Sequence, residues 1–176
     1  GLEPIEWRVL AIEGNRALII TEDAIECKKY NLSRMEVTWE TCTIRTWLNE
    51  DFINAAFDAT EQALILTTTL TTADNTESGM MGGNDTADKV FLLSVEEALQ
   101  YFPDDASRQC YCTPYADERG IDPDAVTGYV TWTLRTPGML QDCVVSTYTD
   151  GTMSYNGLHV EYEHNGIRPA MWINIG

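Results

Sequence analysis

Two arginines stand inside segments that otherwise have the pattern of hydrophobic strands. Arg135 lies within TWTLRTPG, residues 131–138, and Arg168 lies within GIRPAMWINI, residues 166–175. A buried guanidinium without partners costs several kcal/mol, whereas its five N–H donors can hold several loop carbonyls and a carboxylate at once. We therefore predict structural arginines that fix loops onto the sheet, with a ligand-binding role as the alternative. The candidate carboxylate partners are Glu40 and Asp142.

Aromatic side chains in the C-terminal part of the chain could form a recognition surface. Rings on an exposed sheet face can stack on sugars or anchor a protein partner, although about half of these rings are expected to face the core. The candidate binding residues are Tyr129, Trp132, Tyr148, Tyr155 and Tyr162.

Residues 67–88 are rich in Thr, Gly, Asn and Asp, and this composition predicts a long surface loop. Its carboxylate and amide oxygens are hard ligands of the kind that calcium prefers, but their spacing does not follow an EF-hand. A role as turn residues is therefore favoured, and calcium is kept only as a possible cofactor. The calcium candidates are Asp74, Asp85 and Asp88, with Asn75 and Asn84 beside them.

The segment HVEYEH, residues 159–164, combines histidine and glutamate in a way that could hold a metal ion. On a strand, alternation places His159, Glu161 and Glu163 on one face and His164 on the other. We therefore expect a solvated hairpin face here and no metal site.

The remaining residue types offer no evident catalytic machinery. The five cysteines cannot pair completely, and the close pair Cys110 and Cys112 matches neither an ordinary disulfide nor a zinc-ribbon spacing. Reduced, mostly buried thiols are the favoured interpretation. Neither a Ser-His-Asp arrangement, a phosphate-binding loop nor a convincing carboxylate pair is recognisable. The chemistry-bearing residues therefore favour binding over catalysis.

The composition restricts the possible partners. The chain has 176 residues and a formal net charge of −17, which disfavours nucleic acid and anionic lipid and tolerates cations, neutral sugars and basic proteins. No apolar run approaches the roughly 20 residues of a membrane-spanning helix, so we expect no direct membrane insertion. The length suits one domain, residues 1–176.

The pattern of elements predicts an α+β fold. A hairpin is expected around Gly14-Asn15, a helix over residues 44–56, and further helices after capping signatures that begin at Asp58 and Ser94. Residues 89–94 have the pattern of a buried strand. The C-terminal part is expected to be a strand followed by two hairpins, one around Asp150-Gly151 with a type I′ turn and one around Asn165-Gly166. The order of hairpin, helices and C-terminal strands excludes alternating βαβ units.

Four stretches, taken together in their order along the chain, resemble a bacterial family of domains of unknown function, number 6273. The most specific is a W-x-L-R-[ST]-P-G signature followed by G-[VI]-R-P-A-[LM]-W-I, which matches residues 132–138 and 166–173. The other stretches are EWRVLAIEGNRALIIT, VTWETCTIRTWLNEDFINAAF and NDTADKVFLLSVEEA. Members more often have Trp-Trp-Leu-Arg-Ser where this chain has Thr131-Trp132-Thr133-Leu134-Arg135-Thr136.

The resemblance implies a C-type-lectin-like fold, similar to that of formylglycine-generating enzymes, in which the N-terminal hairpin pairs with the C-terminal strand and two or more helices flank a mixed antiparallel sheet and long loops. It also implies a module of a larger surface or secreted protein of gut anaerobes. We accordingly expect a non-catalytic, extracellular adhesion or recognition module that binds a glycan or a protein. An enzyme on the same fold, such as an oxidase similar to the formylglycine-generating enzymes, is the alternative, although Cys110 and Cys112 lie outside the region where that copper chemistry would be expected.

Overall fold

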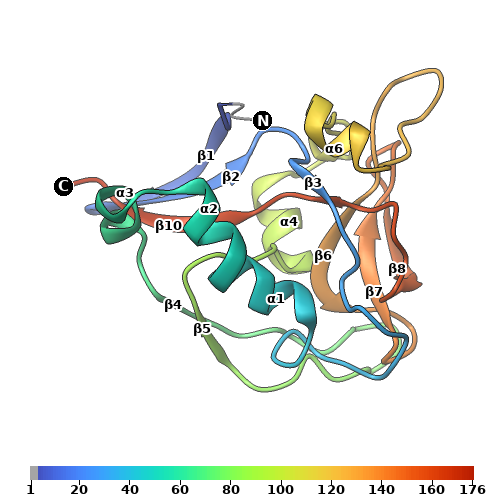
Figure 1. Ribbon diagram of the computed structural model, residues 1–176. Helices are drawn as coiled ribbons and strands as arrows, with labels where there is room; N and C mark the ends of the chain where they lie inside the picture. Colours follow the sequence, from blue (N-terminus) through green and yellow to red (C-terminus); the bar gives the residue numbers. More distant parts are fainter. Residues whose placement is uncertain (1–3) are drawn as a thin grey trace.

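The computed structural model describes residues 4–176, and its first sheet joins segments from both ends of that range (Figure 1). The strands β1 (Trp7–Glu13) and β2 (Arg16–Thr21) form the predicted hairpin, and β10 (Ala170–Asn174) pairs with the other side of β2. The strand order is β1-β2-β10, and both pairings are antiparallel. The predicted pairing of the N-terminal hairpin with the C-terminal strand is confirmed.

The second sheet has five strands in the order β3-β9-β6-β7-β8. It is mixed, because β9 runs antiparallel to β3 and parallel to β6, whereas β7 runs antiparallel to both of its neighbours, β6 and β8. Together with the helices, the two sheets confirm the α+β class. The strands are β3 (Glu26–Cys27), β6 (Trp132–Pro137), β7 (Cys143–Thr147), β8 (Met153–His159) and β9 (Gly166–Ile167).

The predicted hairpin around Asn165-Gly166 is wrong. The chain turns directly after β8, where the N–H of Tyr162 donates to the carbonyl of His159 at 2.8 Å, and Gly166 then enters β9 between two other strands. Gly166 is needed for close packing rather than for a turn, because a Cβ at this position would lie 2.7 Å from the Cβ of Ala24.

The hairpin of β7 and β8 around Asp150-Gly151 is confirmed, but its turn differs from the predicted type I′. A type I′ turn needs a positive φ at both central residues. Here Gly151 has a φ of 84°, while no non-glycine residue of the described chain has a positive φ. Asp150 instead accepts hydrogen bonds from the backbone N–H and the hydroxyl of Thr152 at 3.0 and 2.7 Å.

The predicted central helix forms one continuous helical run in front of the first sheet (Figure 1). It consists of α1 (Thr43–Trp47), the π-helical turn η1 (Leu48–Phe52) and α2 (Ile53–Ala56). The predicted capping boxes at Asp58 and Ser94 are both present, and each side chain accepts the backbone N–H three residues later. The other helices are α3 (Ala59–Leu64), α4 (Val95–Tyr101), α5 (Asp105–Arg108) and α6 (Pro114–Glu118).

The predicted long loop is closed at its base by a small two-stranded sheet of β4 (Thr68–Leu70) and β5 (Thr86–Asp88). Asn75 fixes its middle to the second sheet, because its Nδ2 donates to the carbonyls of Pro137 at 2.8 Å and Tyr155 at 3.2 Å. Residues 90–94 are buried as predicted and Lys89 is half-buried, but the segment forms only an isolated bridge between Phe91 and Ala170 in place of a regular strand.

Both arginines singled out in the sequence are buried, with 2% of Arg135 and 1% of Arg168 exposed. Arg135 forms an ion pair with Glu97 and donates to the carbonyl of Leu92 at 2.7 Å and to that of Thr71 at 3.2 Å. It thereby holds α4 and the base of the loop against β6. The carboxylate partner is not Glu40 or Asp142, because these side chains bind Asn84 and Arg34.

Among the described residues, no carboxylate forms a hydrogen bond with Arg168. Arg168 donates to the carbonyl of Thr21 at 2.9 and 3.1 Å and to that of Glu22 at 2.8 Å, and its guanidinium lies 4.8 Å from the ring centre of Trp132. Burial lowers its pKa from the ordinary value because the charged form is desolvated. These hydrogen bonds fix the end of β2 to the segment between β9 and β10.

Candidate functional site

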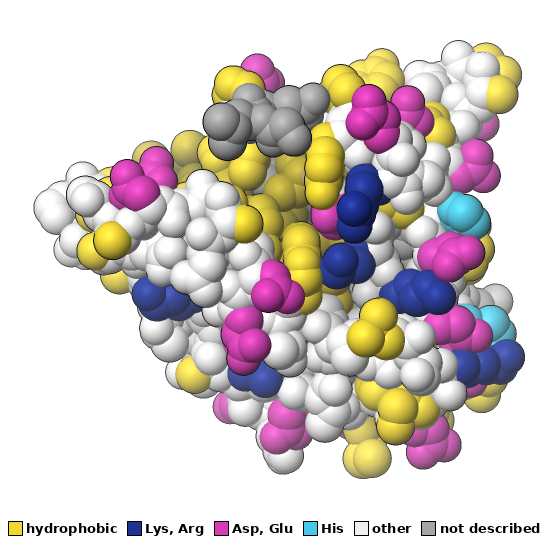
Figure 2. Space-filling model, in the orientation of Figure 1, with side chains coloured by type: hydrophobic (Ala, Val, Ile, Leu, Met, Phe, Trp, Pro, Cys, Tyr) yellow, Lys and Arg dark blue, Asp and Glu magenta, His cyan; other side chains and the backbone are white. Residues whose placement is uncertain are grey.

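A cavity of about 560 Å³ lies between the central helical run and α6. Figure 2 shows a hydrophobic depression near the middle of this face, with basic side chains on one side of it and acidic side chains nearby. Its volume lies within the range of small-ligand sites. The lining residues that matter most are Ile25, Glu26, Lys28, Trp47, Asp51, Phe52, Tyr115 and Arg119.

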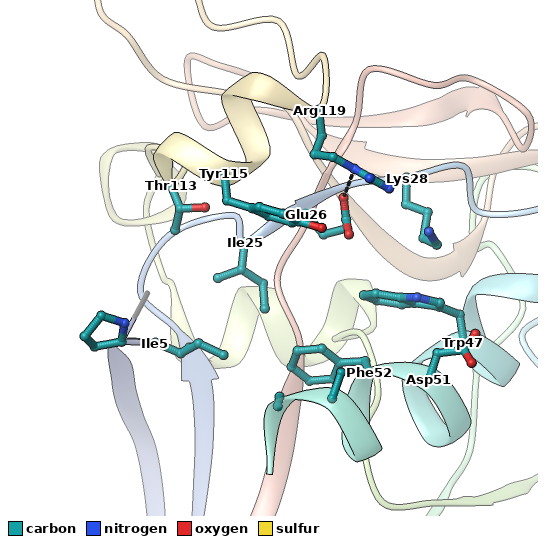
Figure 3. Close-up of a pocket in the computed structure, with 13 residues that line it drawn as sticks. Ile5, Ile25, Glu26, Lys28, Trp47, Asp51, Phe52, Thr113, Tyr115 and Arg119 are labelled. Carbon is teal, nitrogen blue, oxygen red and sulfur yellow. Dashed lines mark hydrogen bonds and ion pairs between the residues drawn. The ribbon is translucent and has the colours of Figure 1, made fainter. Parts of the chain in front are cut away.

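One wall of the cavity comes from a single stripe of the helical run. Trp47, Asp51 and Ala55 follow one another at intervals of four residues, which places them on one helical face. Phe52 completes this wall, and its ring centre lies 5.5 Å from that of Trp47. In Figure 3, Trp47 and Phe52 lie on the side of the cavity opposite Tyr115.

The opposite wall comes from α6. The hydroxyl of Thr113 caps this helix by accepting the N–H of Ala116 at 3.2 Å, and Pro114 occupies the first turn, where a missing N–H costs nothing. The helix presents Tyr115 to the cavity, and the guanidinium of Arg119 lies 5.7 Å from its ring centre. Between the two walls, the chain around β3 contributes Ile25 (Figure 3).

Among the described residues, two carboxylates and two cations line the cavity. Glu26 is buried, and its Oε1 accepts hydrogen bonds from Arg119 Nε at 3.2 Å and from the N–H of Cys27 at 3.0 Å. Lys28 places its Nζ 4.8 Å from the ring centre of Trp47. This arrangement provides aromatic surface together with both donors and acceptors, which suits binding of a polar, uncharged group.

The aromatic residues predicted from the sequence lie elsewhere and are not gathered into one patch. Trp132 is 1% exposed and belongs to the core, where its Nε1 donates to the carbonyl of Arg108 at 2.9 Å. Tyr155 is half-buried against the core. The ring centre of Tyr129 lies 4.6 Å from that of Tyr111, and Tyr162 meets His164 edge to face at 5.5 Å, whereas Tyr148 is exposed near the turn between β7 and β8.

The calcium candidates are similarly dispersed, with Asp74 and Asp85 exposed and Asp88 buried. Both oxygens of Asp88 are engaged, because Arg45 donates to Oδ1 at 2.7 Å while the hydroxyl of Thr86 and the indole N–H of Trp39 donate to Oδ2 at 2.7 and 2.9 Å. In the described part of the chain, the three aspartates do not form a group whose oxygens all lie within 4.8 Å of one another.

The HVEYEH segment is also split. Glu163 faces Lys29 at 3.3 Å, and His164 Nδ1 lies 2.7 Å from the carbonyl of Gly120. His159 lies apart from both, and its Nδ1 is 3.4 Å from the Sγ of Cys143 on the neighbouring strand.

All five cysteines are free thiols. Burial raises the pKa of Cys27, Cys42 and Cys110 to about 11, because the thiolate would be desolvated. The pKa of Cys112 is also raised, mainly by burial. These thiols are therefore protonated at neutral pH and poor nucleophiles.

The comparison with protein families gives a match over nearly the entire described chain. The model of a domain of unknown function, DUF6273, matches residues 14–175. The chain belongs to this family. No curated protein and no solved structure matches it. None of the helices in the described part of this DUF6273 domain has the length and apolar character needed to cross a lipid bilayer.

The cavity of the DUF6273 domain was missed by the sequence analysis. Trp47 and Phe52 belong to an apolar helical pattern that predicts a core face, yet Trp47 is only half-buried. The sequence around Tyr115 and Lys28 has no pattern that predicts a binding site, because these residues approach Trp47 only through the tertiary packing of α6 and β3. A usable signal is the placement of Asp51 on the same stripe as Trp47, since a carboxylate is unusual on a fully buried helical face.

Proposed function

We propose that this domain is a non-catalytic recognition module, and that the cavity between α1–α2 and α6 binds a sugar residue of a neutral glycan. The observation that carries this proposal is the combination of aromatic walls with paired charges. Trp47 and Tyr115 provide ring surface, while Lys28, Asp51 and Arg119 surround it with donors and acceptors.

A sugar ring matches both properties. Its C–H faces pack against aromatic rings, and its hydroxyl groups both donate and accept hydrogen bonds. A neutral sugar also avoids the repulsion that a net charge of −17 exerts on an anionic ligand. Because the cavity is partly open and binds one ring at a time, we expect weak affinity for a single unit.

We further propose a C-type-lectin-like topology and an extracellular or cell-surface location within a larger bacterial protein. The pairing of β10 with β2 supports the topology, since it joins the N-terminal hairpin to the C-terminal strand. The acidic surface and the family resemblance are compatible with the location. Glycan binding should not require calcium, because the oxygens of Asp88 are already engaged by protein donors.

A glycan array with the purified domain tests the proposal, with and without calcium. Tyr115→Ala is expected to reduce binding by about fivefold or more, the loss that corresponds to about 1 kcal/mol of contact energy. Tyr148→Ala is the matched control, because Tyr115 and Tyr148 are 38% and 37% exposed but only Tyr115 lines the cavity.

Two results would contradict the proposal. One is the absence of neutral-glycan binding under both conditions. The other is a loss of binding with Tyr148→Ala and not with Tyr115→Ala, which would assign recognition to the C-terminal aromatic residues. Stoichiometric copper held by Cys110 and Cys112 in the same sample would favour the oxidase alternative.

A further inference from the structure

A second site lies on the hairpin of β7 and β8, and it involves none of the residues that line the cavity. Cys143 and His159 are directly paired across the two strands, so their side chains leave the same face of the sheet. Asp142 directly precedes Cys143, and its carboxylate lies beside the Cys143 thiol and the His159 imidazole. The three ligand atoms all lie within 4.8 Å of one another.

Two of the three distances between ligand atoms match the edges of a tetrahedral metal site, and the third is slightly longer. Cys143 Sγ lies 3.4 Å from His159 Nδ1 and 3.6 Å from Asp142 Oδ1, and His159 Nδ1 lies 3.8 Å from Asp142 Oδ2. In a tetrahedral zinc site with Zn–S of about 2.3 Å and Zn–N or Zn–O of about 2.0–2.1 Å, neighbouring ligand atoms are roughly 3.3–3.6 Å apart. Small side-chain rotations would therefore complete three corners of the tetrahedron.

A nucleophilic role for Cys143 fits the geometry less well. In a catalytic triad the imidazole uses one nitrogen toward the nucleophile and the other toward the carboxylate. Here the same nitrogen of His159 faces both Cys143 and Asp142. The pKa of Cys143 is raised, first by burial and then by the charge of Asp142, so the thiol is protonated at neutral pH.

The surroundings suit a bound cation. Arg34 Nε donates to Asp142 Oδ2 at 2.8 Å, which orients the carboxylate and leaves Oδ1 directed at the thiol. The side chains of His159 and Asp142 are 44% and 19% exposed, so an ion and a water molecule can reach the site from solvent. The donor set of one sulfur, one nitrogen and one oxygen favours zinc over calcium or magnesium.

We propose that Asp142, Cys143 and His159 form a zinc-binding site with three protein ligands and solvent at the fourth position. Binding releases the thiol proton of Cys143 to solvent and leaves the His159 proton on Nε2. The site would tie the start of β7 to the end of β8.

Calorimetric titration with zinc, and absorption spectroscopy with cobalt(II) as a probe of thiolate ligation, test the proposal in the intact domain. The wild type should bind one zinc ion and show a thiolate-to-cobalt charge-transfer band. Cys143→Ser should abolish the band, and His159→Gln and Asp142→Asn should weaken zinc binding by at least about tenfold.

Cys112→Ser and His164→Gln are the matched controls, because they remove the same residue types outside the site and should leave binding unchanged. Thermal unfolding without metal checks that each variant is folded. A wild type that binds no zinc or cobalt would overturn the proposal. A charge-transfer band that persists in folded Cys143→Ser, or is lost with Cys112→Ser, would also overturn it.

Discussion

At the scale of single residues, buried charges hold the loops in place, and Arg168 is the clearest case. Its guanidinium contacts the carbonyls of Thr21 and Glu22 and the ring of Trp132. Arg168→Met would leave these two carbonyls without donors, at about 1–3 kcal/mol for each unsatisfied group. We expect the melting temperature to fall by roughly 5 °C or more in calorimetry.

The control for this variant is Arg34→Met. Arg34 is half exposed and forms a surface ion pair with Asp142, and such pairs contribute about 1 kcal/mol or less. If both variants lower the melting temperature equally, the buried contacts of Arg168 do not carry the effect.

Asp88 illustrates how a residue suited to bind calcium can be fully engaged in the core. Asp88→Asn replaces one acceptor oxygen by an NH₂ group, which can only donate, so the side chain loses either the bond from Arg45 or the bonds from Trp39 and Thr86. In calcium-free buffer we expect a loss of about 1–3 kcal/mol in the free energy of unfolding, measured by urea titration. The exposed Asp85→Asn should remain within about 0.5 kcal/mol of the wild type, and an equal effect of both changes would count against this assignment.

At the scale of elements, the β7–β8 turn is locked against α5 through Gly151. Gly14 and Gly151 both have a positive φ, but only Gly151 is crowded: an added Cβ would lie 1.8 Å from the carbonyl oxygen of Asp105, whereas Gly14 has nothing within 4 Å. Gly14→Ala should therefore cost only the backbone strain, about 1–2 kcal/mol.

Gly151→Ala must in addition move the turn away from α5 and disturb the bond from Arg108 Nε to the Gly151 carbonyl. We expect it to cost at least about 2 kcal/mol more than Gly14→Ala in the free energy of unfolding. Similar costs for the two variants in chemical denaturation would show that the turn can shift without penalty.

The elements also show what the sequence could and could not predict. Capping boxes and the first hairpin depend on neighbouring residues, so Asp58, Ser94 and Gly14 were sufficient to predict them. The cavity and the Asp142, Cys143 and His159 cluster depend on register and packing between distant segments. Strand alternation predicted that His159 and Glu161 share one face of a strand. However, β8 ends at His159, so Glu161 lies outside the strand, and His159 shares its face of the sheet with Cys143 on β7.

At the scale of the whole molecule, charge repulsion opposes folding. The chain carries 28 acidic and 11 basic residues, and its net charge is −17. Salt shortens the screening length from about 30 Å at 0.01 M to about 3 Å at 1 M. We expect the urea midpoint at pH 7 to rise as sodium chloride is raised across this range, and a falling midpoint would show that attractive ion pairs dominate.

The strand directions of the first sheet determine how this molecule would respond to mechanical tension. β1 and β10 both run antiparallel to the central strand β2, so they point the same way, and β1 begins opposite Thr21 while β10 ends opposite Arg16. A pull between the two ends would act along the strands and load the hydrogen bonds on both sides of β2 in shear, all at once. In single-molecule force spectroscopy, pulling between residues 6 and 175 should need a higher rupture force than pulling between residues 6 and 22, the open end of the hairpin, which would separate β1 from β2 one bond at a time.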